Sequence, residues 1–394
     1  MNDMRNVVIA GIGQTVFGKF LSRSVRSLAE EALKAATKDA GVSETEIETV
    51  FFANALSGLV TGQETVRGQV ALRYTDLMGR PIINVDNACA SGSSAFRLAW
   101  LSVASGQAEI ALAIGSEKLT HEDKTVTFGA FAAGVDVEER NRLMKEMPEN
   151  RSLFMDIYAD RARKYMAASG ASEEDFAKVC VKSRRAGTLS PWAQFTNETT
   201  VEEVLGSRVV RSPLTLPMCS PIADGAAAVV LVSEKVARRL GCRPIVVKDS
   251  TLVSANRDGA DPSAAERAGQ LAYEAAGIGP EDIHVAEVHD ASAPAEIMLY
   301  EKLGFARKFE GVALLRSGAT SIGGRLPVNP GGGLLSRGHP VGATGLAQIV
   351  ELTTQLRGAA GSRQRKGAKV ALAECSGGQI GMDSALASVS ILTA

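Results

Sequence analysis

The sequence predicts an α/β protein. Three observations support this fold class: apolar runs punctuated by glycine alternate with helical patterns along the 394 residues, the strand-like runs are apolar throughout, and part of the pattern occurs twice. The length exceeds what one ordinary core requires, so we expect two or three units. A hydrophobic content of 45% and a formal net charge of −1 are typical of a soluble globular protein, and no basic excess is present to bind nucleic acid.

The N-terminal segment, MNDMRNVVIAGIG, enters a β-branched strand directly. It has no charged leader, long apolar stretch or small-residue cleavage site, and no later run reaches membrane-spanning length. We therefore expect a cytoplasmic protein that does not bind membranes. The five cysteines are scattered and never in CxxC spacing, which argues against a disulfide framework and a zinc knuckle.

Two segments share a pattern that predicts a helix, an acidic turn and a short strand. LKAATKDAGVSETEIETVFFANA, residues 33–55, resembles GQLAYEAAGIGPEDIHVAEVHDA, residues 269–291. Further along, a strand, a tight turn, a helix and a strand occur around Cys89 and again around His339. The chain is thus predicted to contain two copies of a βαβ-type domain.

The region between the two copies differs in character. Residues 118–211 contain charged amphipathic helices, with a helix-capping signal at Ser172. We predict three parts: residues 1–117 with 212–245 as the first copy, residues 118–211 as an insertion, and residues 246–394 as the second copy.

NACASGSSAF places Cys89 at a strand end, directly before the small residues that open a helix. Unpaired backbone N–H groups and the helix dipole stabilise a thiolate there, so we expect the pKa of Cys89 to be lowered and its sulfur to be nucleophilic. A small buried cysteine fits this segment alone equally well.

SRGHPVGATG puts His339 at the corresponding place in the second copy. Gly338 and Pro340 fix the turn, and the glycines at 342 and 345 let the next helix pack closely. Because the two helices are related by the repeat, we expect their starts to approach each other, as a thiol and its base require. A nucleophile with its base is therefore favoured over two core residues.

AECSGGQIG ends a buried strand on Cys375, before Gly377 and Gly378. A thiol can give and take a proton, so a second cysteine beside the first would serve as acid and base, and the glycine N–H groups could hold an oxyanion. A structural cysteine is the alternative. The glycine-rich stretches match neither a phosphate-binding GxxxxGK[ST] loop nor a dinucleotide fingerprint, so we expect neither ATP nor NAD.

EVHDASAPAE, residues 287–296, leaves the role of His289 open. A metal ligand, a catalytic base and a structural histidine look alike in this decapeptide. No ligand cluster accompanies it in the sequence, so we predict no metal site, and the base is better placed at His339. Asp290 either orients His289 or only ends the strand.

Four motifs together resemble the thiolase superfamily over essentially the whole chain. They are NACASGSSAF, VHDASAPAE, NPGGGLLSRGHPVGATGLAQ and CSGGQIG. The GHP motif with the late Cys-x-Gly-Gly motif separates thiolases from ketoacyl synthases and HMG-CoA synthases. Two further features resemble the sterol-carrier and archaeal branch of this superfamily: the segment VKSRRAGTLSPWAQF and the His of VHD. Some members of that branch work with a small partner protein that contains an OB fold and a zinc ribbon. The resemblance implies layers in the order α/β/α/β/α, an inserted loop domain and a homodimer.

The resemblance also implies site roles. Cys89 would be the acylated nucleophile, with His339 as its base. Cys375 would protonate or deprotonate the α-carbon, and His289 would donate to the thioester oxyanion beside His339. The N–H groups of Cys89 and Gly377 would form a second oxyanion hole. The implied activity is CoA-dependent Claisen cleavage of a 3-oxoacyl-CoA, or the reverse, with CoA as a substrate and no bound metal or redox cofactor.

Ser292 stands where relatives usually have phenylalanine after the HDA sequence. We expect this change to leave space for a bulky or aromatic acyl chain, such as that of benzoylsuccinyl-CoA. Many relatives in this branch replace the late cysteine and place another after the His-Asp pair; here Cys375 is kept and Ala291 follows, so acid–base duty is assigned to Cys375.

Three alternatives stay open: an acetoacetyl-CoA thiolase (acetyl-CoA C-acetyltransferase), a non-catalytic acyl-CoA-binding scaffold, and a retro-aldolase, against which Cys89 and Cys375 argue. Six basic residues of the insertion could meet the phosphates of CoA, although a solvated helix face is favoured for each of them: Arg161, Arg163, Lys164, Lys182, Arg184 and Arg185.

Overall fold

The structure is a computed structural model that describes residues 4–144, 152–257 and 261–394. Within these residues, nine strands form one sheet in the order β3-β2-β4-β7-β1-β8-β11-β10-β9. The strands are β1 (Val7–Gln14), β2 (Thr49–Ala53), β3 (Ile82–Val85), β4 (Ile110–Glu117), β7 (Gly225–Ser233), β8 (Val246–Ser254), β9 (Val285–Glu287), β10 (Val370–Gly377) and β11 (Leu386–Thr393). The pairing of β1 with β8 rests on Val8 and Val246, so this narrow junction divides the sheet into two halves.

The two halves have the same topology. In the first, β1 pairs antiparallel with β7, β7 antiparallel with β4, and β4 parallel with β2. In the second, β8, β11, β10 and β9 follow each other with the same relative directions. β3 extends the first half beside β2, and a parallel bridge between Ala286 and Val328 takes its place beside β9. The predicted duplication is confirmed.

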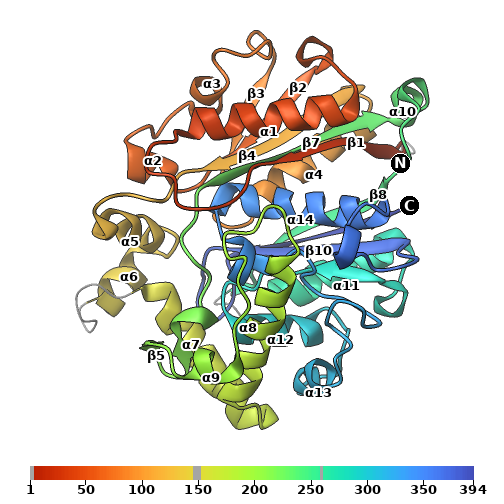
Figure 1. Cartoon of the computed structure of the whole chain (residues 1–394). Coiled ribbons are helices and arrows are strands. Elements are labelled where there is room, and N and C mark those ends of the chain that lie inside the picture. The colour runs from red at the N-terminus through yellow and green to blue at the C-terminus, as the bar shows by residue number, and fades with distance from the viewer. Residues whose placement is uncertain (1–3, 145–151, 258–260) are drawn as a thin grey trace.

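The helices form layers around the two half-sheets. Figure 1 shows α1 (Val25–Ala40) on the outer side of the first half and α11 (Ala264–Ala276) with α12 (Ala293–Lys302) on the outer side of the second. Helices α4 (Ser91–Ala104) and α14 (Val341–Leu356) lie in the middle layer, and their apolar side chains share one core cluster with strands of both halves. All residues of α14 are buried. The layer order is the predicted α/β/α/β/α arrangement.

Small residues let the starts of α4 and α14 touch. A Cβ atom on Gly92 would lie 2.9 Å from the carbonyl oxygen of Gly342, and one on Gly345 would lie 2.5 Å from the amide nitrogen of Ser93. Any larger residue at either glycine would push the two helices apart. This contact fixes the separation of the residues that precede the two helices, Cys89 and His339.

Between β4 and β7 the chain leaves the sheet. The elements there are α5 (Lys124–Ala132), α6 (Val137–Met144), α7 (Leu153–Ser169), α8 (Glu173–Thr188), α9 (Val201–Leu205) and the hairpin of β5 (Val209–Arg211) with β6 (Leu214–Thr215). The capping box predicted at Ser172 forms with Asp175. Residues 145–151 of the predicted insertion lie outside the described residues, and the three-part division of the chain stays a prediction.

Helix α8 anchors this excursion to the second half. The hydroxyl of Ser183 donates to the carbonyl oxygen of Gly332 at 2.5 Å, and the ammonium group of Lys182 lies 2.6 Å from the carboxylate of Glu296. The remaining α-helices are α2 (Ser57–Thr61), α3 (Arg67–Ala71), α10 (Glu234–Leu240) and α13 (Gly311–Arg316). Across the described parts of the chain, every helix falls short of the length or apolar character that crossing a bilayer requires.

Candidate active site

Four predicted side chains meet where the middle helices begin. Cys89 lies just before α4 and His339 just before α14, while Cys375 lies in β10 and His289 follows β9. The Sγ atom of Cys89 is 3.2 Å from Nε2 of His339, and Sγ of Cys375 is 3.1 Å from the carbonyl oxygen of Cys89. The imidazole rings of His289 and His339 have centroids 5.2 Å apart. The fold therefore brings two thiols and two imidazoles into one cluster.

The turn that carries Cys89 is held in an uncommon conformation. Ala88 has a φ of 48°, a left-handed value that costs a non-glycine residue free energy. The hydroxyl of Ser91 accepts from the amide of Asn87 at 2.8 Å and donates to the carbonyl oxygen of Ala88 at 2.7 Å, which stabilises the turn. On its other side, a Cβ atom on Gly377 would lie 2.9 Å from the amide nitrogen of Ala90. The absence of a side chain at Gly377 thus allows β10 to pack against the turn that carries Cys89.

A threonine sets the tautomer of His339. The hydroxyl of Thr344 donates to the carbonyl oxygen of Pro340 at 3.0 Å and lies 2.8 Å from Nδ1 of His339. Because the hydroxyl proton is already used, Thr344 accepts from Nδ1–H of His339. This leaves Nε2, the atom that faces Cys89, without a proton and able to accept one.

Both imidazoles are neutral near pH 7. Burial lowers the pKa of His339 well below its ordinary value, and His289 and Arg337 lower it further. Burial likewise lowers the pKa of His289 to about 4. A neutral His339 can act as a base, and a neutral His289 can donate an N–H group to a substrate oxygen.

The expected lowering of the Cys89 pKa is wrong. Burial raises the pKa of this thiol to about 12, with a further rise from the negative charge of Glu117. The amides of Cys89 itself and of Gly378 oppose this shift without overcoming it. The amides at the start of the helix stabilise a thiolate, but the loss of hydration on burial destabilises it by more. Activation of the sulfur therefore depends on proton transfer to His339 during attack.

The thiol of Cys375 is also protonated. Its pKa lies well above the ordinary value, mainly because of burial and then because of the negative charges that Glu374 and Cys89 carry when they are ionised. A protonated thiol suits a group that delivers a proton to a carbanion. The amide of Gly378 faces the Cys89 sulfur. The oxyanion roles expected for the glycine amides of this segment, including that of Gly377, stay predictions.

Asp290 ends the strand and holds a loop, and its carboxylate is not used to orient His289. Its two oxygens accept from the amides of Leu334 at 2.7 Å and Leu335 at 3.4 Å. These amides belong to a π-helical turn, Gly333–Arg337, that leads into His339. His289 is held through its own amide, which donates to Glu374 at 3.0 Å. Among the described residues, Nε2 of His289 has no hydrogen-bond partner.

Glu117, at the end of β4, is a buried residue that sequence analysis missed. Its carboxylate accepts from the amides of Ala55 at 3.0 Å, Ser57 at 2.6 Å and Gly342 at 2.7 Å. It thereby ties the start of α14 to the loop after β2. The sequence signal was available, because Glu117 is the polar end of the apolar strand IALAIGSE.

Tyr158 of α7 is a second missed residue. Burial raises the pKa of its phenol, and the negative charge of an ionised Cys89 is the next largest cause, followed by smaller contributions that include Glu374 and Cys375. Arg161 lies over the Tyr158 ring at 5.8 Å and donates to Gln379 at 2.9 Å, so α7 covers the loop that follows Cys375. Nothing in the local sequence marks this tyrosine, because its place depends on how the excursion folds back.

Ser292 and two of the basic residues considered for CoA binding have partners or packing of their own. The Ser292 side chain is fully buried at the start of α12, and its hydroxyl has no hydrogen-bond partner among the described residues. Lys182 is buried in its ion pair with Glu296, so it is not available to CoA phosphates. Arg184 stacks on the Phe195 ring at 3.9 Å.

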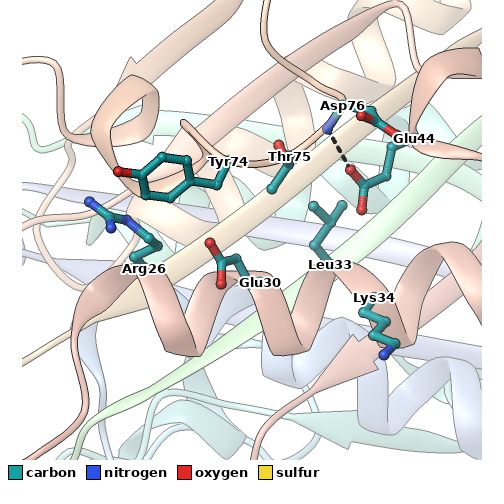
Figure 2. Close-up of a pocket in the computed structure, with 8 residues that line it drawn as sticks. All are labelled: Arg26, Glu30, Leu33, Lys34, Glu44, Tyr74, Thr75 and Asp76. Carbon is teal, nitrogen blue, oxygen red and sulfur yellow. Dashed lines mark hydrogen bonds between the residues drawn. The ribbon is translucent and has the colours of Figure 1, made fainter.

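A separate surface pocket lies over α1, away from this cluster. Figure 2 shows the guanidinium of Arg26 beside the Tyr74 ring, 4.7 Å from its centroid, and the carboxylate of Glu44 accepting from the amide of Asp76. The lining also includes Glu30 and other residues of α1 and none of the predicted catalytic groups. Its mixture of charges gives no single ligand preference.

Comparison with known families decides the assignment. A model of the thiolase N-terminal domain matches residues 7–235, and a model of the thiolase C-terminal domain-like family matches residues 246–392. The chain belongs to the thiolase family. It is an acyltransferase of this family, as its motifs imply.

Several relatives resemble this thiolase along its length. The benzoylsuccinyl-CoA thiolase subunit BbsB of Thauera aromatica is 40% identical, over 90% of this chain and 89% of the relative. An acetyl-CoA acetyltransferase of Methanothermobacter thermautotrophicus is 38% identical, over 95% and 97%. Human sterol carrier protein 2 is 35% identical, over 94% of this chain and 69% of the relative.

Solved structures agree on the fold. The Ltp2-ChsH2(DUF35) aldolase superposes with a TM-score of 0.81 at 25% identity and covers 100% of this thiolase and 99% of that chain. Human mitochondrial 3-ketoacyl-CoA thiolase in complex with CoA superposes with a TM-score of 0.76 at 19% identity, over 99% of this chain and 98% of that one.

Proposed function

We propose that this thiolase cleaves a 3-oxoacyl-CoA with CoA, or catalyses the reverse condensation, through an acyl-enzyme on Cys89. The observation that carries this proposal is the 3.2 Å contact between Cys89 Sγ and Nε2 of His339. The hydrogen bonding of Thr344 assigns the proton of this imidazole to Nδ1. A structural cysteine needs neither a neutral base at that distance nor a threonine that sets the tautomer of the base.

The first half-reaction transfers the acyl group to sulfur. Cys89 attacks the 3-oxo carbon while its proton passes to His339, and the C2–C3 bond then breaks. The acyl group is left as a thioester on Cys89, and the other product is an acyl-CoA enolate. Protonated His339 and the N–H of His289 face the enolate oxygen; removing one such donor costs about 3 kcal/mol in comparable enzymes. Cys375 gives its proton to the α-carbon, which completes the first acyl-CoA.

The second half-reaction restores the enzyme. CoA gives its thiol proton to the Cys375 thiolate and attacks the acyl group on Cys89. The Cys89 thiolate leaves and takes back the proton from His339. The proton count is balanced, and a sulfur nucleophile keeps the acyl group activated as a thioester throughout.

For the substrate, we propose a bulky or aromatic acyl chain. Support comes from Ser292, whose small side chain stands where relatives usually have phenylalanine, and from the 40% identity to a benzoylsuccinyl-CoA thiolase subunit. An acetoacetyl-CoA substrate is the second candidate, and the 38% identity to an archaeal acetyl-CoA acetyltransferase favours it.

A substrate panel tests this choice. The protein is incubated with CoA and with acetoacetyl-CoA, a branched 3-oxoacyl-CoA or benzoylsuccinyl-CoA, and kcat/KM is measured for each. We expect the highest value for benzoylsuccinyl-CoA, and we expect Ser292→Phe to lower that value more than Ser292→Ala does. The bulky-substrate proposal fails if acetoacetyl-CoA is cleaved best.

The same assay separates the remaining alternatives. A retro-aldolase, as the similarity to an aldolase structure would allow, would cleave its substrate without CoA. A non-catalytic scaffold would bind acyl-CoA and release no product. The proposed thiolase requires CoA and forms two acyl-CoA products.

We further propose two protein partners. The edge strand β3 exposes Ile83, and the nearby Tyr74 and Val66 are also exposed, as expected for a face that a second copy covers in a homodimer. A small OB-fold and zinc-ribbon protein is the second partner; the subunit name of one relative and the aldolase complex with a DUF35 protein support it. Light scattering of wild type and Ile83→Lys tests the dimer, and co-expression with a neighbouring small gene tests the second partner.

A further inference from the structure

Cys89, His289 and His339 form a potential metal site. Their ligand atoms, one sulfur and two ring nitrogens, all lie within 4.8 Å of one another. A tetrahedral Zn²⁺ ion with bonds of about 2.0–2.3 Å holds its ligand atoms roughly 3–4 Å apart. The sulfur of Cys89 and Nε2 of His339, at 3.2 Å, already have this spacing. The three ligands come from segments that are far apart in the sequence, so local residue spacing predicted no metal site.

The two imidazoles are prepared for coordination. Nε2 of His339 carries no proton, because Nδ1–H is committed to Thr344. His289 is 5% exposed, and its Nε2 has no hydrogen-bond partner among the described residues. A buried nitrogen without a partner is costly, and a metal ion that enters the cluster would satisfy it. His289 would then carry its remaining proton on Nδ1.

The donor set selects the kind of ion. Thiolate and imidazole suit Zn²⁺ and related borderline transition metals, whereas Mg²⁺ and Ca²⁺ prefer oxygen ligands. Three protein ligands leave a fourth position for water. Binding requires the thiolate, so Zn²⁺ displaces the proton of Cys89 to solvent and forms one Zn–S bond and two Zn–N bonds.

We propose that Zn²⁺ binds reversibly to Cys89, His289 and His339 and inhibits this thiolase. The bound ion occupies the sulfur lone pair that attacks the substrate and the nitrogen that accepts the proton. It also removes the N–H group that His289 would offer to the enolate oxygen. Competition with acyl-CoA follows from this overlap, and that part of the inference rests on the proposed function.

Calorimetry on the whole protein tests binding without reference to activity. The protein is freed of metal with EDTA, exchanged into a non-chelating buffer and titrated with ZnCl₂. We expect one Zn²⁺ per chain and release of about one proton, measured from the heats in buffers of different ionisation enthalpy. Co²⁺ provides a second probe, because a cobalt–thiolate bond gives an absorption band that a site without sulfur lacks.

Variants decide which residues bind the ion. Cys89→Ala and His289→Asn each remove a ligand, and we expect the affinity for Zn²⁺ to fall by at least about 100-fold, the upper end of what losing an outer-shell partner costs. Cys242→Ser is the matched control, because it removes a partly exposed thiol outside the cluster and should bind Zn²⁺ as wild type does. Equal affinity in Cys89→Ala and wild type, or no binding by wild type, overturns the metal site.

Activity and labelling keep the two proposals apart. If wild type cleaves a 3-oxoacyl-CoA and Zn²⁺ neither binds nor inhibits it, the metal site is wrong and the proposed function stands. If Zn²⁺ binds through Cys89 but no acyl-CoA substrate is cleaved, the proposed function is wrong and the metal site stands. Added acyl-CoA should weaken Zn²⁺ binding at least tenfold; no effect would contradict competition.

Discussion

Thr344 lies one helical turn beyond His339 and accepts a hydrogen bond from its Nδ1 atom at 2.8 Å. The same hydroxyl donates to Pro340, so its orientation is fixed. This relationship leaves the nitrogen that faces Cys89 free of a proton. The proposed base therefore depends on a threonine that contacts its other ring nitrogen.

Replacing Thr344 by valine tests this dependence. Valine leaves the Nδ1–H of His339 without an acceptor, and such a loss costs about 1–3 kcal/mol, so kcat/KM should fall roughly 10- to 100-fold. Thr354→Val is the matched control: its hydroxyl also donates to a carbonyl one turn back on α14, at 2.8 Å, and is not bonded to His339. Equal losses in both variants would show that Thr344 only supports the helix.

The pH dependence of activity tests the neutral state of His339. Burial lowers the pKa of His339, so the base form persists below the pH at which an exposed imidazole gains its proton. The acid limb of the kcat/KM profile should therefore lie below pH 6.5, the ordinary value for histidine. Each sample is returned to pH 7.5 and assayed again as a control for unfolding. A limb at or above pH 6.5 contradicts the assignment.

Acid stability tests the burial of His289. Its pKa falls from 6.5 in the unfolded chain to about 4 in the folded protein. The folded state thus binds fewer protons in this window, and the stability that His289 contributes is lost as pH falls from 6.5 towards 4. Between pH 7.5 and 5, wild type should lose about 2 kcal/mol more unfolding free energy than His289→Asn. Denaturant titration at both pH values measures this difference, and equal losses would contradict it.

A substitution at Gly345, where α14 packs against α4, tests how Cys89 and His339 are held together. A Cβ atom there would lie 2.5 Å from the amide nitrogen of Ser93, so Gly345→Ala should separate α4 from α14 and lower both stability and activity. Gly129 in α5 is the control, because a Cβ atom there meets nothing within 4 Å. Gly129→Ala should keep full activity and gain up to about 1 kcal/mol of stability. Thermal unfolding and kcat/KM of both variants check this, and a harmless Gly345→Ala would be the contrary result.

Much of the fold could be predicted because the chain repeats itself. The two helices that follow Cys89 and His339 are related by the internal repeat. Such a repeat brings the first turns of related helices close together, so the approach of Cys89 to His339 could be predicted from the sequence. The layer order and the thiolase family followed from motifs around these residues. The three-part division was predicted from a change in composition alone.

Other parts of the site depend on packing that no local pattern records. Tyr158 was not predicted, because its neighbours are fixed only by the tertiary fold, and the contact of Thr344 with His339 depends on where α14 begins. The pKa of Cys89 was predicted with the wrong sign, because a helix start is visible in the sequence and burial is not. The metal-ligand spacing of Cys89, His289 and His339 was not visible in the sequence either, because these residues come from three distant segments.

Trapping the acyl-enzyme tests the central claim most directly. The protein is mixed with a 3-oxoacyl-CoA in the absence of free CoA, quenched in acid, digested and analysed by mass spectrometry, with Cys89→Ser and Cys242→Ser alongside. We predict an acyl group on the peptide that contains Cys89 in wild type and Cys242→Ser, its loss when CoA is added before the quench, and no thioester adduct in Cys89→Ser. An adduct on another cysteine, or product formation by Cys89→Ser at the wild-type rate, would contradict the account.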